Sequence, residues 1–324
     1  MIVSKFGGKA TTCKEAILNI KKLSVNKKRK ILVFSAVGKL FDDHKLTDLF
    51  ISFAKTYRTR QPTSAIKKEI VEKLSTLCTL TKVKFNVENA FTRAIVEFIQ
   101  TENDDFLVSR GEYFTALIMS KFLKVKFVPS EKLLFFKNNL LDEKKSKQRI
   151  SFYLKRYPQI VTTGFYGVNE NNEIFLFPRG GGDLSGSFFA SLCKAKFYEN
   201  WTDIDGVREV NPQVCISKKV EQMSFDELEF ISNLDANIIH RDCAKILKKT
   251  NTKLLIASIF EMEKKPTIVT KNSQQENVFV CFSVAANNAI VYLKKQKTCQ
   301  KFIVTKDEFP TFVCSLYKKE KTFD

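Results

Sequence analysis

The chain has 324 residues and a formal net charge of +19, and 44% of its residues are hydrophobic, which is typical of a globular protein with one large domain and one small one. Its longest basic run is only Lys27–Lys30, and the other lysines are dispersed, which argues against nucleic acid as a partner. No apolar run approaches the roughly 20 residues of a membrane span, and the strand-like start lacks a signal-peptide layout, so we expect a cytoplasmic protein without a membrane partner.

The first residues predict a strand followed by a phosphate-binding turn. Residues 1–5 have the pattern of a strand, which the glycine pair Gly7-Gly8 interrupts. The glycines let a phosphate approach the backbone, and Lys5 supplies a point charge beside them. Because the lysine precedes the glycines, the segment is not a Walker A loop. Thr12 and Glu15 then form a capping-box pattern, which predicts a helix start.

The next segments predict alternating strands and helices. Residues 31–36 form an apolar run, as expected of a strand that a parallel sheet buries on both faces. A turn follows at Ser35–Gly38, and Thr47 with Asp48 starts a helix, where simple helix capping explains this pair equally well. Charged and apolar positions alternate through 64–100, which indicates helix with a solvated face.

Residues 109–122 predict a helix with Glu112 near its start, where a carboxylate can simply complement the helix dipole. A charged helix is expected over 142–157. A further strand is expected over 160–165.

Three consecutive glycines, Gly180 to Gly182, stand between Arg179 and Asp183. Glycines contribute no side chain to packing and have a backbone-entropy cost, so the triplet indicates a close approach of the backbone to something charged. Asp183 is a candidate N-cap for a helix whose apolar residues repeat at helical spacing. A glycine turn at a helix start is a ready anion site, although a lone triplet is also common in flexible surface loops.

Thr202 and Asp203 follow a strand-like segment at 197–198. The carboxyl ends of strands are where open α/β sheets bind ligands, so these two residues are candidates for the same site.

The rest of the chain predicts another helix–strand unit and a short tail. Ser224 and Glu227 form a second capping-box pattern. A helix follows His240, for which we expect a core or helix-cap role, and then a strand over 253–259. The tail predicts a strand (278–284), a helix (287–295) and two strands (302–305 and 311–317). The eight cysteines form no C-x-x-C pair, so we expect free thiols and no metal site.

Five motifs in this order resemble the aspartokinase family. They are Lys5-Phe6-Gly7-Gly8, the turn Ser35–Gly38, Gly111-Glu112, Gly164-Phe165 with Gly167, and the glycine turn Arg179–Asp183 followed by Trp201-Thr202-Asp203. The resemblance implies a three-layer α/β/α sandwich of the amino-acid kinase type with a mainly parallel central sheet. It implies a catalytic domain over residues 1–270. The segment 271–324 is too short for the family's two ACT domains, and we expect a truncated α+β, ACT-like remnant.

The reaction that the resemblance implies is phosphoryl transfer from ATP, with Mg²⁺, to the β-carboxylate of L-aspartate. The product would be 4-phospho-L-aspartate, at the first step of lysine, threonine and methionine biosynthesis. Such a transfer needs alignment and charge compensation more than covalent help from the protein. The acceptor carboxylate is already ionised at neutral pH, so no general base is required.

The resemblance also implies roles for individual residues. The catalytic residues would be Lys5, Arg179 and Asp183. The substrate-binding residues would be Ser35, Thr47, Glu112, Phe165 and Arg179. The ATP-binding residues would be Lys5, Gly7, Gly8, Gly181, Gly182, Thr202, Asp203 and Arg208. In this scheme Arg179 binds the α-carboxylate of the substrate and Glu112 its amine, so that together they aim the β-carboxylate.

Three positions depart from the family pattern, all on the nucleotide side. Gly182 replaces a serine, Gln213 an arginine, and Asn237 a lysine of many members. Loss of one hydrogen-bond donor to a transition state costs on the order of 3 kcal/mol. Two alternatives therefore stay open: a kinase of another small acid such as glutamate or acetylglutamate, and a weak or non-catalytic partner subunit. The family also implies a homodimer, although many family dimers depend on the longer tail.

Overall fold

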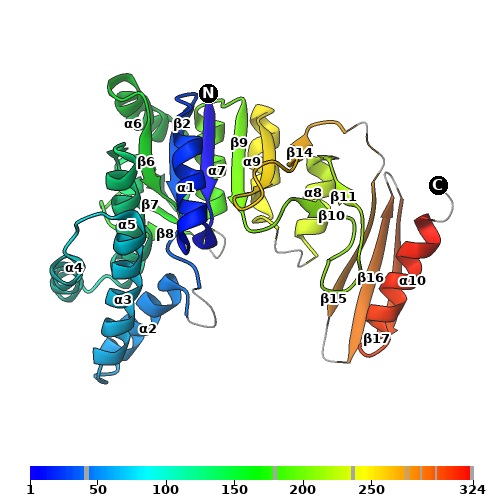
Figure 1. Cartoon of the computed structure of the whole chain (residues 1–324), viewed down its shortest axis with the longest axis horizontal. Helices are drawn as coiled ribbons and strands as arrows, with labels where there is room; N and C mark the ends of the chain where they lie inside the picture. The colour runs from blue at the N-terminus through cyan, green and yellow to red at the C-terminus, as the bar shows by residue number, and fades with distance from the viewer. Residues whose placement is uncertain are drawn as a thin grey trace.

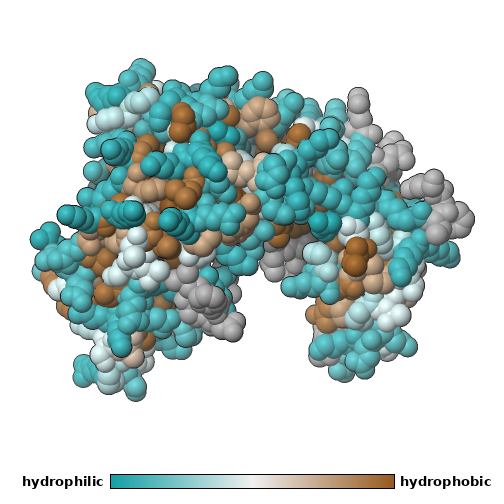
Figure 2. Space-filling view, in the orientation of Figure 1, coloured by the Kyte–Doolittle hydropathy of each residue, from teal (hydrophilic) through white to brown (hydrophobic). Residues whose placement is uncertain are grey.

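The computed structural model describes residues 1–39, 44–177, 181–234, 238–273, 275, 277–284, 287–295 and 298–321. A large α/β part carries most of the chain, and a small sheet with one helix lies at the carboxyl-terminal end (Figure 1). The first strand runs through the middle of the large part (Figure 1). In the space-filling view, the surface is hollowed between the large part and the small sheet (Figure 2).

The large part is built on an eight-stranded sheet. Its strands, from one edge to the other, are β12 (Gln222–Ser224), β14 (Thr267–Thr270), β13 (Lys253–Ser258), β9 (Phe197–Thr202), β1 (Ile2–Phe6), β2 (Arg29–Phe34), β6 (Ile160–Thr163) and β3 (Lys126–Phe127). The pairs are parallel except for β13 with β14, which is antiparallel. The predicted mainly parallel sheet is therefore confirmed.

Helices cover both faces of this sheet. On one side of the sheet, a single core joins α1 (Lys14–Ser24), α2 (Leu46–Arg58), α3 (Ser64–Thr81), α4 (Val87–Thr101) and α5 (Asp104–Leu123). In it, α3 packs on α2 and α5, and α4 packs on α3 and α5. The other face packs on α6 (Glu143–Arg156), α7 (Gly181–Leu192), α8 (Phe225–Ser232) and α9 (Asp242–Thr250). Within β2, Leu32 and Phe34 join the first core while Ile31 and Val33 join the second. This alternation confirms the three-layer α/β/α sandwich.

Short elements connect the layers. They are the 3₁₀ helices η1 (Gly8–Thr11) and η2 (Ser130–Lys132), and three hairpins: β4 (Phe136–Lys137) with β5 (Leu140–Leu141), β7 (Tyr166–Val168) with β8 (Ile174–Leu176), and β10 (Val207–Arg208) with β11 (Lys219–Val220). Within the described ranges, none of the helices combines the length and the hydrophobicity that a bilayer span requires.

Three predicted helix starts can be compared with the structure. The capping box at Ser224 and Glu227 is confirmed, because both reciprocal bonds are present at the start of α8. The one at Thr12 is wrong: the Thr12 hydroxyl donates to the carbonyl of Lys9, which closes the turn of η1, and α1 begins at Lys14 without a side-chain cap. Helix α5 begins at Asp104, about one and a half turns before the predicted residue 109, because Asn103 caps it, so Glu112 lies in mid-helix.

The tail folds as three antiparallel strands and a helix: β15 (Val278–Val284), β16 (Asn288–Lys295), β17 (Thr298–Thr305) and α10 (Phe309–Lys321). The helix predicted over 287–295 is wrong, because Ala289, Val291 and Leu293 are buried at the two-residue period of a strand. The strand predicted over 311–317 is also wrong. Val313 and Tyr317 are buried four residues apart on one face of α10.

The observed order of three strands followed by a helix differs from the predicted order of strand, helix, strand and strand. The ACT-like interpretation of the tail is therefore not confirmed. The eight-stranded sheet ends with β14 at Thr270, and the small sheet begins with β15 at Val278. The boundary between residues 270 and 271 and the homodimer stay predictions.

Candidate active site

Four parallel strands end at one edge of the central sheet, and each carries a predicted motif. In the register, Lys5 of β1 lies opposite Val33 of β2 and Asn200 of β9. The turns that follow β1, β2, β6 and β9 therefore meet at the same edge, which is where open α/β sheets bind ligands. The sequence interval between these turns is large, so it is the fold that brings them together.

Lys5 and Asp183 form the centre of this edge. The Nζ of Lys5 lies 2.7 Å from Oδ1 of Asp183, and the two side chains are only 11% and 15% exposed. Asp183 also accepts hydrogen bonds from the Nδ2 of Asn200 (3.4 Å) and from the backbone N–H of His240 (3.3 Å). The carboxylate is thus held by three groups, each from a different segment, and it orients the lysine.

The glycine turn reaches this pair. Gly181 and Gly182 are the first residues of α7, so Asp183 is the third residue of the helix and the prediction that it is the N-cap is wrong. A Cβ on Gly182 would lie 2.8 Å from the Oγ of Ser35 and 3.5 Å from the Cε of Lys5. The turn after β1 and the turn that opens α7 therefore face one another across Lys5. The other two predicted residues of this turn, Arg179 and Gly180, lie outside the described residues.

Glu112 projects from the middle of α5 into the same site. Its Oε2 accepts the N–H of Gly164 at 3.0 Å. Burial raises the pKa of Glu112 to about 7, against the opposing effects of hydrogen bonds from the backbone of Ala36 and Gly164 and of the charge of Lys5. A cationic ligand group beside this buried carboxyl group would favour its ionised form, so Glu112 is suited to bind an ammonium group.

Phe165 lines the glycine turn. Its backbone is left-handed, with φ of 72°, and its N–H donates to the Oγ of Ser185 at 2.8 Å. A Cβ on Gly181 would lie 2.6 Å from the Phe165 ring, so glycine at 181 allows this ring to pack against the turn. Strained non-glycine residues are concentrated at functional sites.

Ser35 and Thr47 lie on the β2 side of the site. The N–H of Ser35 donates to the carbonyl of Phe6, which places its hydroxyl beside the glycine turn. Thr47 is the second residue of α2, whose first residue, Leu46, donates to the carbonyl of Val37. Thr47 is therefore near the Ser35–Gly38 turn, one step farther from Lys5.

The N–H of Gly7 has a different role from the predicted one. It donates to the carbonyl of Trp201 at 3.0 Å, which extends the pairing of β1 with β9, and so it is not free for a phosphate. Gly8 starts η1, where the first N–H groups have no partner within the helix. A Cβ on Gly8 would lie 2.8 Å from the carbonyl oxygen of Ala36, so this glycine is required for the close approach of the two turns.

Thr202 ends β9 and Asp203 follows it, on the other side of Lys5. The Oγ1 of Thr202 donates to Asp203, whose Oδ2 lies 2.5 Å from the Nζ of Lys9. Burial alone would raise the pKa of Asp203, but the hydrogen bond from Lys9 and its charge hold that pKa below its usual value. The pair joins the turn after β1 to the end of β9.

Arg208 lies farther from Lys5 and is engaged by other groups. Its guanidinium is 3.3 Å from Asp205 and 3.1 Å from the carbonyl of Ser217. It lines a cavity of about 510 Å³ that also includes Asp203 and Gln213. This volume is in the range of small-molecule sites, so the cavity next to Asp203 is the candidate space for a nucleotide base.

The sequence interpretation missed several groups of this site. Asn200 is 1% exposed, and its Oδ1 has no hydrogen-bond partner among the described residues. The backbone N–H of His240, a residue for which the sequence predicts only a core or helix-cap role, donates to Asp183. Its ring accepts the N–H of Asp242, the first residue of α9, although the N-cap position of this helix is Arg241. Phe279 and Phe282 of β15 form one wall of the nucleotide-side cavity. Nothing in the sequence pattern signals that the tail contributes there.

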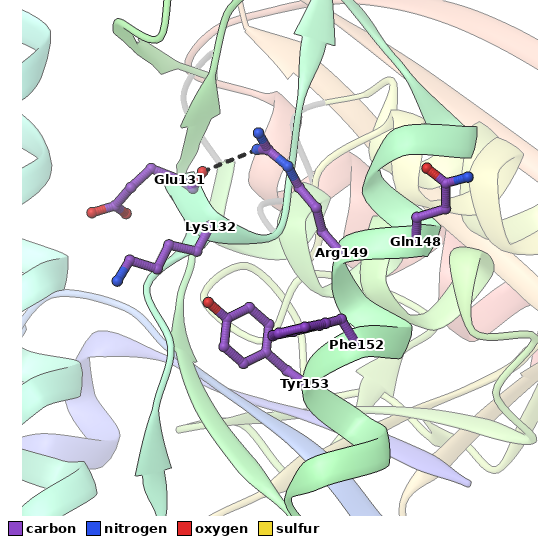
Figure 3. Close-up of a pocket in the computed structure, with 6 residues that line it drawn as sticks. All are labelled: Glu131, Lys132, Gln148, Arg149, Phe152 and Tyr153. Carbon is purple, nitrogen blue, oxygen red and sulfur yellow. Dashed lines mark hydrogen bonds between the residues drawn. The ribbon is translucent and has the colours of Figure 1, made fainter.

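Another hollow lies away from this edge, between η2 and α6. Figure 3 shows its lining, with the Nη1 of Arg149 donating to the backbone carbonyl of Glu131. The lining residues are Glu131, Lys132, Gln148, Arg149, Phe152 and Tyr153. It contains none of the predicted site residues. Among the described residues, there is also no group of three or more histidine, cysteine or acidic side chains arranged to hold a metal ion.

An α/β/α sandwich with glycine turns, a lysine and an aspartate at the carboxyl ends of its central strands has the ligand-site arrangement of open α/β proteins. Residues 1–258 match the sequence model of the Amino acid kinase family. The chain belongs to this family.

Similar curated proteins carry aspartokinase names, which confirms the resemblance that the motifs indicated. The chain is 24% identical to Aspartokinase 3 of Bacillus subtilis over 258 residues, which are 74% of this chain and 57% of the relative. It is 27% identical to the chloroplastic bifunctional aspartokinase/homoserine dehydrogenase 2 of Zea mays over 310 residues, which are 85% of this chain and 33% of that protein. The chain thus spans little more than half of the first relative and a third of the second.

Solved structures show the same fold. Aspartate kinase of Clostridium acetobutylicum superposes with a TM-score of 0.79 at 24% identity, over 89% of this chain and 67% of that one. Aspartokinase III of E. coli in complex with aspartate and ADP superposes with a TM-score of 0.73 at 17% identity, over 92% and 70% of the two chains.

Proposed function

We propose that the chain is an aspartate kinase, which transfers the γ-phosphoryl group of MgATP to the β-carboxylate of L-aspartate. The observation that carries the proposal is the meeting of two glycine turns around the Lys5–Asp183 pair, with Glu112 beside them. The aspartokinase names of the relatives and the aspartate and ADP bound to the E. coli structure support the choice of substrates.

Each group has a task in this reaction. A carboxylate oxygen of L-aspartate attacks the γ-phosphorus, and the bond from that phosphorus to the β-phosphate oxygen breaks, which releases ADP. Lys5 offsets the charge on the transferred group, and Asp183 fixes the direction of its ammonium. Glu112 accepts the substrate ammonium, and Arg179 is assigned the α-carboxylate by family resemblance. The free N–H groups of η1 and the glycines of α7 cradle the phosphates.

The nucleotide would lie between Asp203 and the cavity that includes Arg208 and Gln213. Lys9 is a cation available to the phosphates, since its side chain is 60% exposed and already lies against Asp203. Arg208 is held by Asp205, so its contribution is to shape the cavity wall. Lys9 is therefore our candidate to offset the departures at Gly182 and Gln213; the third departure, Asn237, lies outside the described residues.

A coupled assay of ADP release with a panel of acceptors tests the proposal. We expect ADP release that depends on L-aspartate, is absent with L-glutamate and N-acetylglutamate, and is lost in Lys5→Ala and Arg179→Ala chains. Release that follows glutamate or acetylglutamate instead would assign a kinase of another acid. Nucleotide binding without turnover of any acceptor would assign a non-catalytic partner subunit.

The pKa of Glu112 predicts how substrate affinity depends on pH. The ammonium of L-aspartate requires an ionised carboxylate, and Glu112 ionises with a pKa of about 7. The KM for L-aspartate should therefore fall about tenfold between pH 6 and pH 8. Steady-state kinetics across this range measure it. In Glu112→Gln the KM should be high and nearly independent of pH, while the exposed Glu88→Gln control should keep the wild-type profile.

The same pKa fixes the sign of a stability effect. Because the folded chain holds the Glu112 proton more tightly than the unfolded chain does, this residue makes stability fall as the pH rises from about 4.5 to about 7. Urea unfolding of Glu112→Gln should lack this decrease. An equal decrease in the variant would contradict the raised pKa.

A further inference from the structure

A second polar cavity lies between α4, α5, η2 and the β7–β8 hairpin. Its volume is about 630 Å³, which falls within the range of small-molecule sites. Arg110 and Glu131 line it, together with Glu97, Glu173, Asn103 and Asn172. The proposed kinase reaction makes no use of this cavity.

Arg110 is the buried cation of the cavity. It is only 7% exposed, and its guanidinium carbon lies 4.4 Å from the ring centres of both Phe106 and Tyr113. Its Nε donates to the carbonyl of Phe106, and its Nη2 to the hydroxyl of Ser109. Among the described residues, no carboxylate lies within ion-pair distance of it, and its direct hydrogen bonds go to neutral groups. A buried charge without a counter-ion is costly, which leaves this guanidinium able to bind an anionic group.

Glu131 is the complementary group. Its Oε2 is buried and has no partner at hydrogen-bond distance among the described residues. The hydroxyl of Tyr166, a fully buried side chain, lies beside this carboxylate, and burial together with the charge of the carboxylate raises the pKa of the tyrosine. Figure 3 shows the Glu131 carboxylate pointing away from α6 while its backbone carbonyl faces Arg149. Such a buried acceptor normally has a donor. The exposed Glu97 and Glu173 add negative charge at the rim.

We propose that this cavity binds a small zwitterion, such as a free α-amino acid, with its carboxylate against Arg110 and its ammonium against Glu131. The carboxylates of the lining would repel a ligand that carries only negative charge, and the guanidinium would repel one that carries only positive charge. A zwitterion satisfies the buried guanidinium and the partly buried carboxylate at once.

The cavity and the candidate active site are lined by neighbouring residues of the same elements. Arg110 and Glu112 are two residues apart in α5, and Tyr166 directly follows Phe165, which lines the glycine turn. The N–H of Gly164, at the start of this segment, donates to Glu112. A zwitterion in the cavity would therefore contact α5, which carries Glu112, and β7, which follows Gly164 and contributes Val168 to the lining.

Calorimetric titration of the full chain without nucleotide tests the proposal. The probes are glycine, L-leucine and L-arginine, with succinate and 1,4-diaminobutane as ligands that carry one sign of charge. Acidic amino acids are left out, because the proposed substrate site takes L-aspartate. We expect saturable binding of at least one of the three amino acids and none of the other two ligands.

Matched variants locate the binding. Glu131→Gln, whose Oε2 has no partner to lose, and Arg110→Lys should each bind at least about tenfold more weakly, whereas Asp183→Asn in the candidate active site should bind as the wild type does. Thermal unfolding without ligand checks that each variant is folded; if Arg110→Lys is not, Glu131→Gln decides. Undiminished binding by Glu131→Gln, loss in Asp183→Asn alone, or no binding of any amino acid would overturn the proposal. Since no nucleotide is present, these results do not depend on kinase activity.

Discussion

A Lys5→Met chain is expected to lose nearly all aspartate-dependent ADP release, with kcat lower by about 10²–10³-fold. The methionine keeps most of the length of the side chain but removes the ammonium that lies 2.7 Å from Asp183 and faces the glycine turn. Phosphoryl transfer depends mainly on such charge compensation. The coupled assay at saturating MgATP and L-aspartate measures the change.

The control is Lys14→Met, on the exposed surface of α1, which should leave kcat unchanged. Because Lys5→Met leaves Asp183 without its ammonium partner, urea unfolding must show that the variant is folded under the assay conditions. A folded Lys5→Met chain with more than about a tenth of the wild-type kcat would contradict the role assigned to Lys5.

The largest expected effect on stability is that of Glu199→Ala, which should lower the free energy of unfolding by about 3–5 kcal/mol. The Glu199 carboxylate accepts both Nε and Nη2 of Arg29, at 2.8 and 3.0 Å, as well as the Oγ of Ser4 and the Nε1 of Trp201. The Arg29 and Glu199 side chains are only 13% and 7% exposed. Alanine would leave the guanidinium buried without its counter-ion. Urea unfolding followed by circular dichroism measures the loss.

A double variant separates the lost pair from the lost packing. Glu199→Gln with Arg29→Met removes both charges, so it should be clearly more stable than Glu199→Gln alone. The exposed pair Arg58 with Asp104 supplies a control, since Asp104→Asn should cost less than about 1 kcal/mol. Equal losses for Glu199→Ala and Asp104→Asn would show that the Glu199 cluster is not a buried ion pair in solution.

The central strands and the glycine turns could be predicted from the sequence, because their signals are local. Residues 31–34 are all apolar, as expected of a strand buried on both faces, and the structure places β2 between two cores. The glycine pair Gly7-Gly8, with Lys5 before it, likewise predicts a turn from local sequence alone. The ordering of the motifs then suggested one site, and Lys5, Ser35, Glu112 and Gly182 do meet in the structure.

The parts that could not be predicted depend on tertiary contacts. The tail was assigned the wrong elements at 287–295 and 311–317, because short segments rich in Val, Leu and Lys suit a strand or a helix, and packing decides between them. Asn103 takes the N-cap of α5 and moves Glu112 to mid-helix. The use of the Gly7 N–H by Trp201 follows from the pairing of β1 with β9, which lie almost 200 residues apart in sequence.

Trapping the product tests the proposed reaction most directly. An acyl phosphate reacts with hydroxylamine to give a hydroxamate, so incubation of the chain with MgATP, L-aspartate and hydroxylamine should yield aspartyl hydroxamate and ADP in equal amounts. Lys5→Met should yield neither. ADP formed at the same rate without L-aspartate, or ADP without hydroxamate, would contradict phosphoryl transfer to the β-carboxylate at the edge where the two glycine turns meet.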